Sequence, residues 1–320
     1  MHMLVTGAAG FIGSNLVDRL LELGYQVTGV DNLSTGQIEF LGTAIRNNKF
    51  QFITYDLFKQ QGLEIYMKDV DTIFHLAANA DVRFGSNHPR KDLEQNTIVT
   101  HNVLEAMRIS GVRKIVFSST GSVYGDTDTI PTPENAPFPL QTSLYGASKI
   151  ASEGLISAYS QAFGIKSWIF RFVSILGERY THGHVFDFYE QLVRDPIKLR
   201  VLGNGKQRKS YLYVQDCIDA IFLALENADN AINIFNLGAQ DYCEVNQSIG
   251  WICDKLKVHP TLEFSGGDRG WVGDNPFIFL DTAKIRSLGW EPKVCIEKGI
   301  LRTVEYLQHN EWVFKARMGR

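Results

Sequence analysis

Short apolar runs alternate with longer amphipathic stretches through the first half of the chain. The runs are rich in Val, Ile and Phe, as strands of a parallel sheet with both faces buried are. They predict strands at Met3–Thr6, Tyr25–Val30, Phe50–Thr54, Thr72–Leu76, Lys114–Ser118 and Ser167–Phe172. The stretches between them repeat apolar residues every three or four positions, and they predict helices at Gly10–Leu23, Leu93–Ser110 and Tyr145–Phe163, each followed by a glycine. This alternation is typical of an α/β protein with a doubly wound parallel sheet.

The regular alternation ends near Phe172. Gly, His and Pro interrupt residues 174–205, where the pattern indicates no regular element. Farther on, it predicts a strand at Tyr211–Val214, a helix at Asp216–Leu225, a strand at Ile232–Leu237, and two helices after Tyr242 around a loop at Ser265–Pro276. We therefore expect a nucleotide-binding domain at residues 1–174, completed by about 211–240, and a smaller α/β domain at 175–210 and 241–320.

The composition is that of an ordinary globular protein. Of 320 residues, 44% are hydrophobic and 21% are charged, which excludes disordered, collagen-like and coiled-coil chains. The net charge is -3 and the basic residues form no dense block, so we expect neither nucleic acid nor an anionic membrane as a partner. The chain contains no run of 18 apolar residues, and its first residues do not resemble a signal peptide, so we expect no membrane span.

The cysteines and histidines indicate no disulfide or metal chemistry. The four cysteines lie at irregular spacings without a CxxC pair, which is typical of reduced thiols in a cytoplasmic protein. The nearest histidines, His182 and His184, have no third ligand close in sequence, so we expect no zinc site.

Three glycines directly follow the first predicted strand and open the first helix. Gly7, Gly10 and Gly13 permit a tight turn and a close approach of the backbone to a ligand, and the helix N-terminus offers N–H groups to a pyrophosphate. Asp31 ends the second strand 18 residues after Gly13 and can accept hydrogen bonds from an adenosine ribose. This arrangement predicts a Rossmann-type dinucleotide site. Residues 32–36 contain no Arg or Lys that could pair with a 2′-phosphate, which favours NAD over NADP.

Tyr145 and Lys149 lie four residues apart on the third predicted helix, so their side chains share one face. We expect the Lys149 ammonium to lower the pKa of the phenol from about 10, so that the phenolate can act as a base toward a sugar hydroxyl. Tyr55 and Lys59 have the same spacing, but Tyr55 follows a predicted strand directly, and we interpret that pair as structural. Thr120 follows the fifth strand, at the sheet edge where parallel sheets bind ligands. The alternative for Thr120 is a hydroxyl that only caps the strand end.

Together these motifs resemble the extended short-chain dehydrogenase/reductase family, in particular its UDP-glucose 4-epimerases. The matching segments are GAAGFIG at 7–13, DN at 31–32, DL at 56–57, HLAA at 75–78, SSTGSVYG at 118–125, YGASK at 145–149, GNGKQRKSYLYV at 203–214 and DRGWVGD at 268–274. They span almost the whole chain. The motifs of the first half are specific for the superfamily, whereas those of the second half indicate a sugar nucleotide without naming the sugar.

The resemblance implies an NAD site assembled from the glycine turn and the ends of later strands. The pyrophosphate contacts are expected at Gly7, Gly10, Phe11, Ile12 and Gly13, and the contacts with adenosine at Asp31, Asn32, Leu33, Ser34, Thr35, Gly36, Asp56 and Leu57. The remaining cofactor contacts are expected at Leu76, Ala77, Ala78, Ala80, either Gln95 or Asn96, Ser118, Tyr145, Lys149 and Val173.

The resemblance also implies a catalytic group of Tyr145, Lys149 and Thr120. A substrate site is expected at Thr120, Ser122, Ser174, Arg200, Leu202, Arg208, Lys209, Arg269 and Asp274. Tyr145 would take the proton from the sugar 4-hydroxyl, directly or through Thr120, while NAD takes the C4 hydride and later returns it to the opposite face. The family further implies a homodimer formed by the helices at 93–110 and 145–163.

Several positions decide among the sugar nucleotides that such a chain could use. Gly121 and Ser122 stand where related 4,6-dehydratases and decarboxylases have acidic residues, which favours simple 4-epimerisation. Ser174 replaces the usual asparagine and also suits UDP-glucuronate, whereas Ile278 lies near a position that controls room for an N-acetyl group. Lys209 replaces the usual arginine, and Arg208 is its alternative at the diphosphate.

The sequence therefore predicts an NAD-dependent nucleotide-sugar 4-epimerase acting on UDP-glucose and UDP-galactose. UDP-N-acetylglucosamine and UDP-glucuronate are alternative substrates. A net NAD-linked reductase or dehydrogenase of the same superfamily would differ by consuming or producing NADH during turnover. A non-catalytic dinucleotide-binding protein would have no need of the Tyr145 and Lys149 pair.

Overall fold

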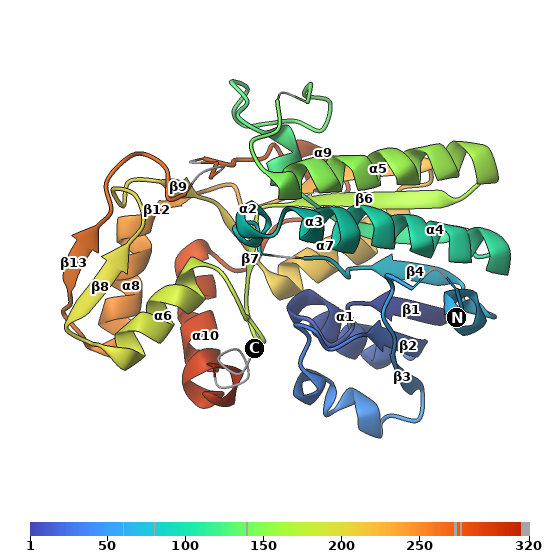
Figure 1. Cartoon of the computed structure of the whole chain (residues 1–320), viewed down its shortest axis with the longest axis horizontal. Coiled ribbons are helices and arrows are strands. Elements are labelled where there is room, and N and C mark those ends of the chain that lie inside the picture. Colours follow the sequence, from blue (N-terminus) through green and yellow to red (C-terminus); the bar gives the residue numbers. More distant parts are fainter. Residues whose placement is uncertain (60, 80, 139, 272–273, 276, 315–320) are drawn as a thin grey trace. The chain divides into compact units, whose positions relative to one another are not determined.

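The chain folds into two compact units, each built from three separate segments (Figure 1). The computed structural model describes residues 1–59, 61–79, 81–138, 140–271, 274–275 and 277–314. Unit 1 comprises Met1–Val123, Leu144–Arg171 and Ile221–Phe235, and unit 2 comprises Tyr124–Ser143, Phe172–Ala220 and Asn236–Arg320.

Unit 1 is built on a seven-stranded sheet with the order β11–β6–β5–β4–β1–β2–β3. The strands are β1 (His2–Thr6), β2 (Gln26–Asp31), β3 (Phe50–Thr54), β4 (Thr72–His75), β5 (Lys114–Thr120), β6 (Lys166–Phe172) and β11 (Ile232–Leu237). The pairs β1–β2, β2–β3, β1–β4 and β4–β5 are parallel, which confirms the predicted doubly wound α/β fold. The strand order reverses between β1 and β4, and this switch point is where open parallel sheets bind ligands.

Helices connect these strands. They are α1 (Phe11–Glu22), α2 (Phe84–Asn87), α3 (Pro89–Asp92), α4 (Val99–Ser110), α5 (Leu144–Phe163) and α7 (Val214–Asn227), with short 3-10 turns at Ile38–Leu41, Ala44–Arg46, Leu63–Met67 and Gly121–Tyr124. The glycines expected to end helices, Gly24, Gly111 and Gly164, have φ values of 81°, 82° and 66°. These left-handed conformations confirm the predicted helix ends, because glycine adopts them without steric cost.

The helix predicted at Leu93–Ser110 is interrupted at its start. Residues Leu93–Ile98 form a π-helical turn before α4 begins at Val99. A π turn leaves a carbonyl without its usual helical partner. Here the Asn96 carbonyl accepts hydrogen bonds from the hydroxyls of Thr100 at 2.6 Å and Ser152 at 3.2 Å, which stabilises the wide turn.

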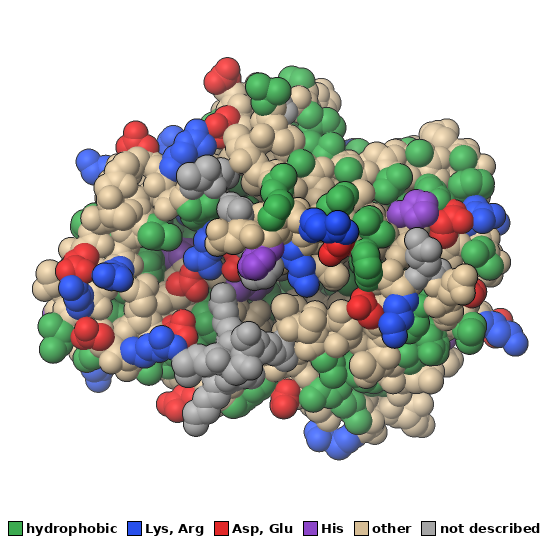
Figure 2. Space-filling model, viewed as in Figure 1, with side chains coloured by type: hydrophobic (Ala, Val, Ile, Leu, Met, Phe, Trp, Pro, Cys, Tyr) green, Lys and Arg blue, Asp and Glu red, His purple; other side chains and the backbone are tan. Residues whose placement is uncertain are grey.

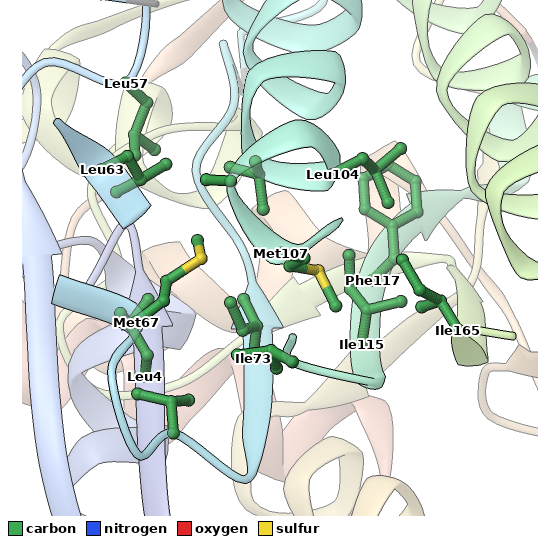
Figure 3. Close-up of a cluster of buried hydrophobic side chains, with 14 of the residues drawn as sticks. Leu4, Leu57, Leu63, Met67, Ile73, Leu104, Met107, Ile115, Phe117 and Ile165 are labelled. Atoms are coloured by element: carbon green, nitrogen blue, oxygen red, sulfur yellow. The ribbon is translucent and has the colours of Figure 1, made fainter. Parts of the chain in front are cut away.

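Both faces of the unit 1 sheet are covered. On one face, Ile73 and Ile115 of the sheet pack with Leu104 and Met107 of α4 in a cluster of buried side chains (Figure 3). Phe74 points to the other face, because neighbouring residues of a strand alternate, and its ring lies 6.4 Å from that of Phe222 in α7. This burial on two faces accounts for the nearly continuous apolar runs in the sequence.

Unit 2 contains smaller sheets and more helices. Its elements are β7 (Ser174–Leu176), α6 (His184–Arg194), β8 (Lys198–Val201), β9 (Arg208–Lys209), β10 (Tyr211–Tyr213), β12 (Cys243–Glu244), α8 (Val245–Leu256), β13 (Thr261–Phe264), α9 (Ala283–Arg286) and α10 (Ile296–His309). Strands β7 and β10 pair in parallel, as do β8 and β13, whereas β9 and β12 are antiparallel. The two helices predicted after Tyr242 correspond to α8 and α10.

The expectation that residues 174–205 contain no regular element is wrong. Helix α6 lies in this segment and buries Val185, Phe188, Tyr189 and Leu192, at positions i, i+3, i+4 and i+7 of one helical face. His182 and Gly183 just before α6, and His184 at its start, obscured this periodicity in the sequence. The predicted loop at 265–276 includes residues outside the described part of the chain.

Some boundaries of the two compact units differ from the predicted domain boundaries. Residues 124–143 and 172–174 group with unit 2, because their hydrogen bonds join them to segments such as 236–237 and 275. Which unit binds the cofactor and which binds the sugar stays a prediction. Among the described residues, none of the helices is long and apolar enough to cross a membrane.

On the face drawn in Figure 2, Lys and Arg side chains lie interspersed with Asp and Glu side chains. This mixture agrees with the small net charge of -3. Surfaces of this kind provide no broad field of one sign to attract a polyanion.

Leu104 provides a test of the core shown in Figure 3. It is fully buried, so Leu104→Ala is expected to lower the free energy of unfolding by about 2–5 kcal/mol. The matched control is Leu23→Ala, because Leu23 is 46% exposed and its loss should cost about 0.5 kcal/mol or less. Urea denaturation measures both changes, and equal losses would contradict this description of the core.

Candidate active site

The glycine turn after β1 forms the floor of the candidate site in unit 1. Gly7 has φ 68°, and its N–H donates to the Val30 carbonyl at 2.9 Å. A Cβ atom at Gly13 would lie 2.0 Å from the Gly7 carbonyl oxygen, so α1 approaches the turn as closely as only glycine allows. The first turn of α1 carries no acidic residue, and its N–H groups are suited to a phosphate.

Asp31, at the end of β2, holds the adjacent loop against this turn. Its carboxylate accepts hydrogen bonds from the N–H groups of Ala9 at 3.0 Å and Leu33 at 2.8 Å. Asn32 Oδ1 accepts from the Ser34 N–H at 3.0 Å, and a Cβ atom at Gly36 would lie 2.8 Å from Asp31 Oδ1. Residues 31–36 therefore wrap around one carboxylate beside the glycine turn, and this glycine-lined cradle fits a dinucleotide.

The segment after β4 lies against the same turn, and the segment after β3 lies beside Asp31, whose carbonyl accepts from the Tyr55 N–H at 3.0 Å. The N–H groups of Leu76 and Ala77 each donate to Thr6 Oγ1 at 3.2 Å, and a Cβ atom at Gly7 would lie 2.8 Å from the Ala77 nitrogen. Asp56 Oδ1 accepts from the Phe58 N–H at 3.0 Å. The neighbouring Leu57 is buried in the core, and Ala80 lies outside the described residues.

Tyr145 lies in the first turn of α5 and forms a hydrogen bond with Thr120, the last residue of β5. Thr120 Oγ1 also accepts a hydrogen bond from the Ser122 N–H at 3.1 Å. With one lone pair engaged in this way, the Thr120 O–H is free to donate toward Tyr145 Oη. This geometry connects the two hydroxyls as the resemblance implies.

Lys149 lies one turn after Tyr145 and is only 2% exposed. Its ammonium donates to the Ser118 carbonyl at 2.8 Å and lies 4.7 Å from the centre of the Phe117 ring. Burial lowers the pKa of Lys149 to about 7, against the opposite effect of the nearby carboxylates of Glu153 and Asp92. The side chain is therefore held at the end of β5 in a site that disfavours its charge.

The expected lowering of the phenol pKa is wrong for the protein alone. Burial raises the pKa of Tyr145 to about 12, the charge of Asp92 adds to this, and only the Thr120 hydrogen bond acts in the opposite direction. The reason is that desolvation of a phenolate outweighs the one hydrogen bond that favours it. Lys149 donates instead to a backbone carbonyl.

Of Gln95 and Asn96, the alternatives for one cofactor contact, the structure joins Asn96 by hydrogen bonds to α5, and which of the two contacts the cofactor stays a prediction. Asn96 is buried, donates to the Ser148 hydroxyl at 2.8 Å, and accepts from the Asn79 N–H at 2.8 Å. Ser148 in turn donates to the Tyr145 carbonyl at 2.8 Å. Asn96 therefore connects the π turn to the first turn of α5, where Tyr145 lies.

A buried ion pair next to the site was not predicted from the sequence. Arg171 of β6 and Glu153 of α5 are joined by two hydrogen bonds of 2.7 and 3.1 Å, and their side chains are 2% and 7% exposed. The Ser119 hydroxyl also donates to Glu153. Glu153 follows Lys149 by one turn, so this network fixes α5 against β5 and β6 next to the buried ammonium.

Unit 2 brings together three of the residues predicted to bind the substrate. Lys209 donates to Asp274 Oδ1 at 3.1 Å and to the Asn275 carbonyl at 3.0 Å. Arg269 donates to the Asp274 carbonyl and to Asp126 Oδ2, both at 2.7 Å. Lys209, Arg269 and Asp274 therefore form one polar cluster, which we call the unit 2 cation cluster.

Other predicted substrate residues lie in different surroundings. The guanidinium of Arg208 stacks 3.9 Å above the centre of the Phe277 ring, so the geometry assigns Lys209, rather than Arg208, to the unit 2 cation cluster. Arg200 is 3.9 Å from Glu263 on the neighbouring strand β13. Leu202 and Ser174 are exposed, whereas Val173 is buried and packs against Gly238.

Comparisons with known proteins place this geometry in a family. A model of the NAD dependent epimerase/dehydratase family matches residues 3–238. The chain belongs to this family. Among its relatives, the UDP-glucose 4-epimerase of Mycolicibacterium smegmatis is 34% identical over 322 residues, covering 97% of this chain and 99% of that protein.

Solved structures of this family have the same fold. The UDP-glucose 4-epimerase of Thermotoga maritima, solved with UDP-glucose, has a TM-score of 0.87 and 34% identity and covers 97% of this chain and 100% of its own. The UDP-glucuronic acid 4-epimerase of Bacillus cereus, solved with UDP-glucuronic acid and NAD, has a TM-score of 0.89 and 28% identity. The match covers 97% of this chain and 99% of that one. These findings confirm the predicted family resemblance and NAD as the cofactor. Among the described residues, no group of three potential ligands could hold a metal ion.

Lys149 provides a test of the electrostatics of this family's site. Its pKa is about 7 in the folded protein against 10.5 for an ordinary lysine, so between these values the unfolded chain binds more protons and stability rises with pH. Lys149→Met should remove this rise. Between pH 7 and pH 9.5 the unmodified chain should therefore gain about 3 kcal/mol in its free energy of unfolding that the variant does not gain.

Urea denaturation over this pH range measures the difference. The matched control is Lys298→Met, because Lys298 is exposed on α10 and its loss should leave the slope of the unfolding free energy against pH unchanged. If the free energies of unfolding of Lys149→Met and the unmodified chain differ by the same amount at every pH, the lowered pKa of Lys149 is contradicted.

Proposed function

We propose that the chain is an NAD-dependent nucleotide-sugar 4-epimerase that interconverts UDP-glucose and UDP-galactose. The observation that carries this proposal is the hydrogen-bonded pair of Tyr145 and Thr120 beside buried Lys149, in the same unit as the glycine turn and Asp31. It is supported by relatives named UDP-glucose 4-epimerase that match over nearly their whole length.

In the proposed reaction, Tyr145 removes the proton of the sugar 4-hydroxyl, directly or through Thr120. NAD, when bound, supplies an oxidised ring that accepts the C4 hydride and gives it back, so no cofactor is consumed. The raised pKa of Tyr145 means that the protein alone holds a neutral phenol, and a positive charge added nearby would favour the phenolate. Lys149 contributes an ammonium whose position is fixed by the Ser118 carbonyl.

The unit 2 cation cluster is suited to the diphosphate of the substrate. Lys209 and Arg269 supply two cations, and Asp274 and Asp126 fix their positions. Arginine and lysine are the usual ligands of phosphate oxygens, and Arg269 can contact two oxygens at once. The distribution of function between the units therefore follows as part of this proposal, with the cofactor in unit 1.

Epimerisation is favoured over elimination by the residues that follow Thr120. Gly121 and Ser122 carry no acid that could transfer a second proton. This distinction matters because a dTDP-glucose 4,6-dehydratase of Streptomyces venezuelae has the same fold, with a TM-score of 0.89 and 26% identity. UDP-glucuronate and UDP-N-acetylglucosamine are the alternative substrates, since epimerases named for these sugars also have this fold.

Incubation of the purified protein with UDP-glucose, UDP-galactose, UDP-glucuronate and UDP-N-acetylglucosamine, followed by NMR of the products, tests the proposal. We expect the C4 epimer of UDP-glucose to form without net production of NADH. Tyr145→Phe should reduce the rate at least about 1000-fold, because it removes the general base, while NAD stays bound.

Tyr55→Phe is the matched control, because the Tyr55 hydroxyl donates to the Gln61 carbonyl and is not part of the proposed reaction, which uses Tyr145 and Thr120. It should keep nearly full activity. Steady accumulation of NADH would indicate a dehydrogenase instead, and equal turnover by Tyr145→Phe and the unmodified chain would refute the assigned role.

We also propose a homodimer formed through α4 and α5. Ile109 of α4 is 61% exposed and Phe163 of α5 is 41% exposed, and the guanidinium of Arg108 lies 5.7 Å from the centre of the Phe163 ring. Apolar side chains of this size on adjacent helices are suited to a second copy of the same face. A cytoplasmic location also stays a prediction from the reduced cysteines.

Light scattering at micromolar concentration tests the dimer. We expect twice the mass of 36.1 kDa for the unmodified chain and the monomer mass for Phe163→Glu, because a buried charge at a subunit contact is costly. Ile65→Glu, which changes a 71% exposed residue of a 3-10 turn, should remain dimeric. A monomeric unmodified chain would contradict the proposal.

A further inference from the structure

Asp92, the last residue of α3, is a buried carboxylate that the proposed reaction does not use. It is 1% exposed. Its Oδ1 atom accepts hydrogen bonds from the side-chain amides of Asn79 at 2.8 Å and Asn96 at 3.5 Å. Among the described residues, its Oδ2 atom has no hydrogen-bond partner, and this atom occupies the place where a side chain at Gly85 would begin, 2.0 Å from an ideal Cβ.

A continuous path of hydrogen bonds leads from Asp92 to the reactive tyrosine. Asn96, which contacts Asp92, donates to the Ser148 hydroxyl at 2.8 Å, and Ser148 donates to the Tyr145 carbonyl at 2.8 Å. Asn79, the other donor to Asp92, also donates its N–H to Asn96 at 2.8 Å. The carboxylate therefore anchors a set of amides and hydroxyls that fixes the first turn of α5.

Asp92 also interacts electrostatically with both reactive side chains. Its charge raises the pKa of Tyr145 and that of Lys149, because it opposes a second negative charge and stabilises a positive one. Burial raises the pKa of Asp92 itself, while the Asn79 hydrogen bond and the Lys149 charge lower it.

The other charged groups around Asp92 are few. Asp81, which is paired with Arg83, raises its pKa. Helix α2, which lies against it, has the sequence FGSN without a titratable group. On α3 itself the side chains of Arg90 and Lys91 complete the set, with Arg90 bound to Glu94. Among the described titratable groups, the two catalytic side chains whose pKa values the Asp92 charge raises are therefore Lys149 and Tyr145.

We propose that Asp92 is a positioning residue of this active site: its buried carboxylate holds the hydrogen-bonded chain of Asn79, Asn96 and Ser148 against the first turn of α5, next to the reacting tyrosine. The expected effect of Asp92 on catalysis rests on the proposed function. Its expected effect on the ionisation of Tyr145 does not.

Asp92→Asn tests this inference, because asparagine has the same shape and removes the charge. The ionisation of Tyr145 is followed by NMR of protein labelled with ¹³C at the tyrosine ζ carbon, with NAD bound, and the signal is assigned by its loss in Tyr145→Phe. We expect the midpoint of this ionisation to fall by about one pH unit in Asp92→Asn. The acid limb of kcat against pH should move to lower pH by the same amount.

The matched control is Glu94→Gln, which removes a carboxylate two residues away that pairs with exposed Arg90. It should leave the midpoint and the acid limb in place. If Asp92→Asn does not fold, as judged by its thermal unfolding, Asp92→Ser also removes the charge and retains a hydroxyl for Asn79.

The outcomes separate this inference from the proposed function. A loss of kcat at every pH with an unmoved Tyr145 midpoint would mean that Asp92 is merely structural, and would overturn the inference. If the unmodified chain does not epimerise any UDP-sugar, the proposed function fails, and the Tyr145 midpoint in Asp92→Asn still decides the electrostatic role of Asp92.

Discussion

Burial of the Lys149 ammonium is the constraint on which much of unit 1 depends. A cation removed from water is costly unless hydrogen bonds and opposite charges surround it. Here the Ser118 carbonyl accepts from it, the Phe117 ring lies beside it, and the carboxylates of Glu153 and Asp92 favour its charge. These partners come from β5, α5 and α3, so each of these elements must be in place before the ammonium can be accommodated.

The same constraint explains why the neighbourhood of α5 is unusually polar for a protein interior. Glu153 is balanced by Arg171, and Ser148 and Ser152 bond the π turn rather than solvent. A network of this kind is stable only if every member is paired. Among the described residues, the Oδ2 atom of Asp92 has no hydrogen-bond partner, which makes the burial of this carboxylate costly.

Much of the fold could be predicted from the sequence, because its signals are local. Strands buried on both faces give apolar runs, and Gly24, Gly111 and Gly164 end helices by a property of glycine alone. The sequence did not reveal α6, whose periodic apolar face follows directly on a loop with glycine and histidines. It also did not reveal the π turn at Leu93–Ile98, which depends on hydroxyls from α5, far along the chain.

The candidate site was predictable only where its residues have fixed spacing. Gly7, Gly13 and Asp31 follow from the turn that a dinucleotide needs, and Tyr145 and Lys149 from one helical turn. Asp92, Asn79, Glu153 and Arg171 have no such spacing, because each meets its partner only in the folded chain: Asp92 of α3 meets Asn79 from the segment after β4, and Glu153 of α5 meets Arg171 of β6. The phenol pKa was predicted in the wrong direction, since desolvation cannot be read from spacing.

The π turn at Leu93–Ile98 has a consequence for the evolution of the helix that contains it. A π turn accommodates one residue more than the α-helical turn it replaces, so the side chains of α4 are rotated by about 100° relative to an uninterrupted helix. Removal of a single residue here would restore regular winding and leave Val103 and Met107 facing the core. Removal of one residue within α4 itself would instead rotate the residues that follow by about 100°, so a one-residue deletion should be tolerated more readily at the π turn than in the helix after it.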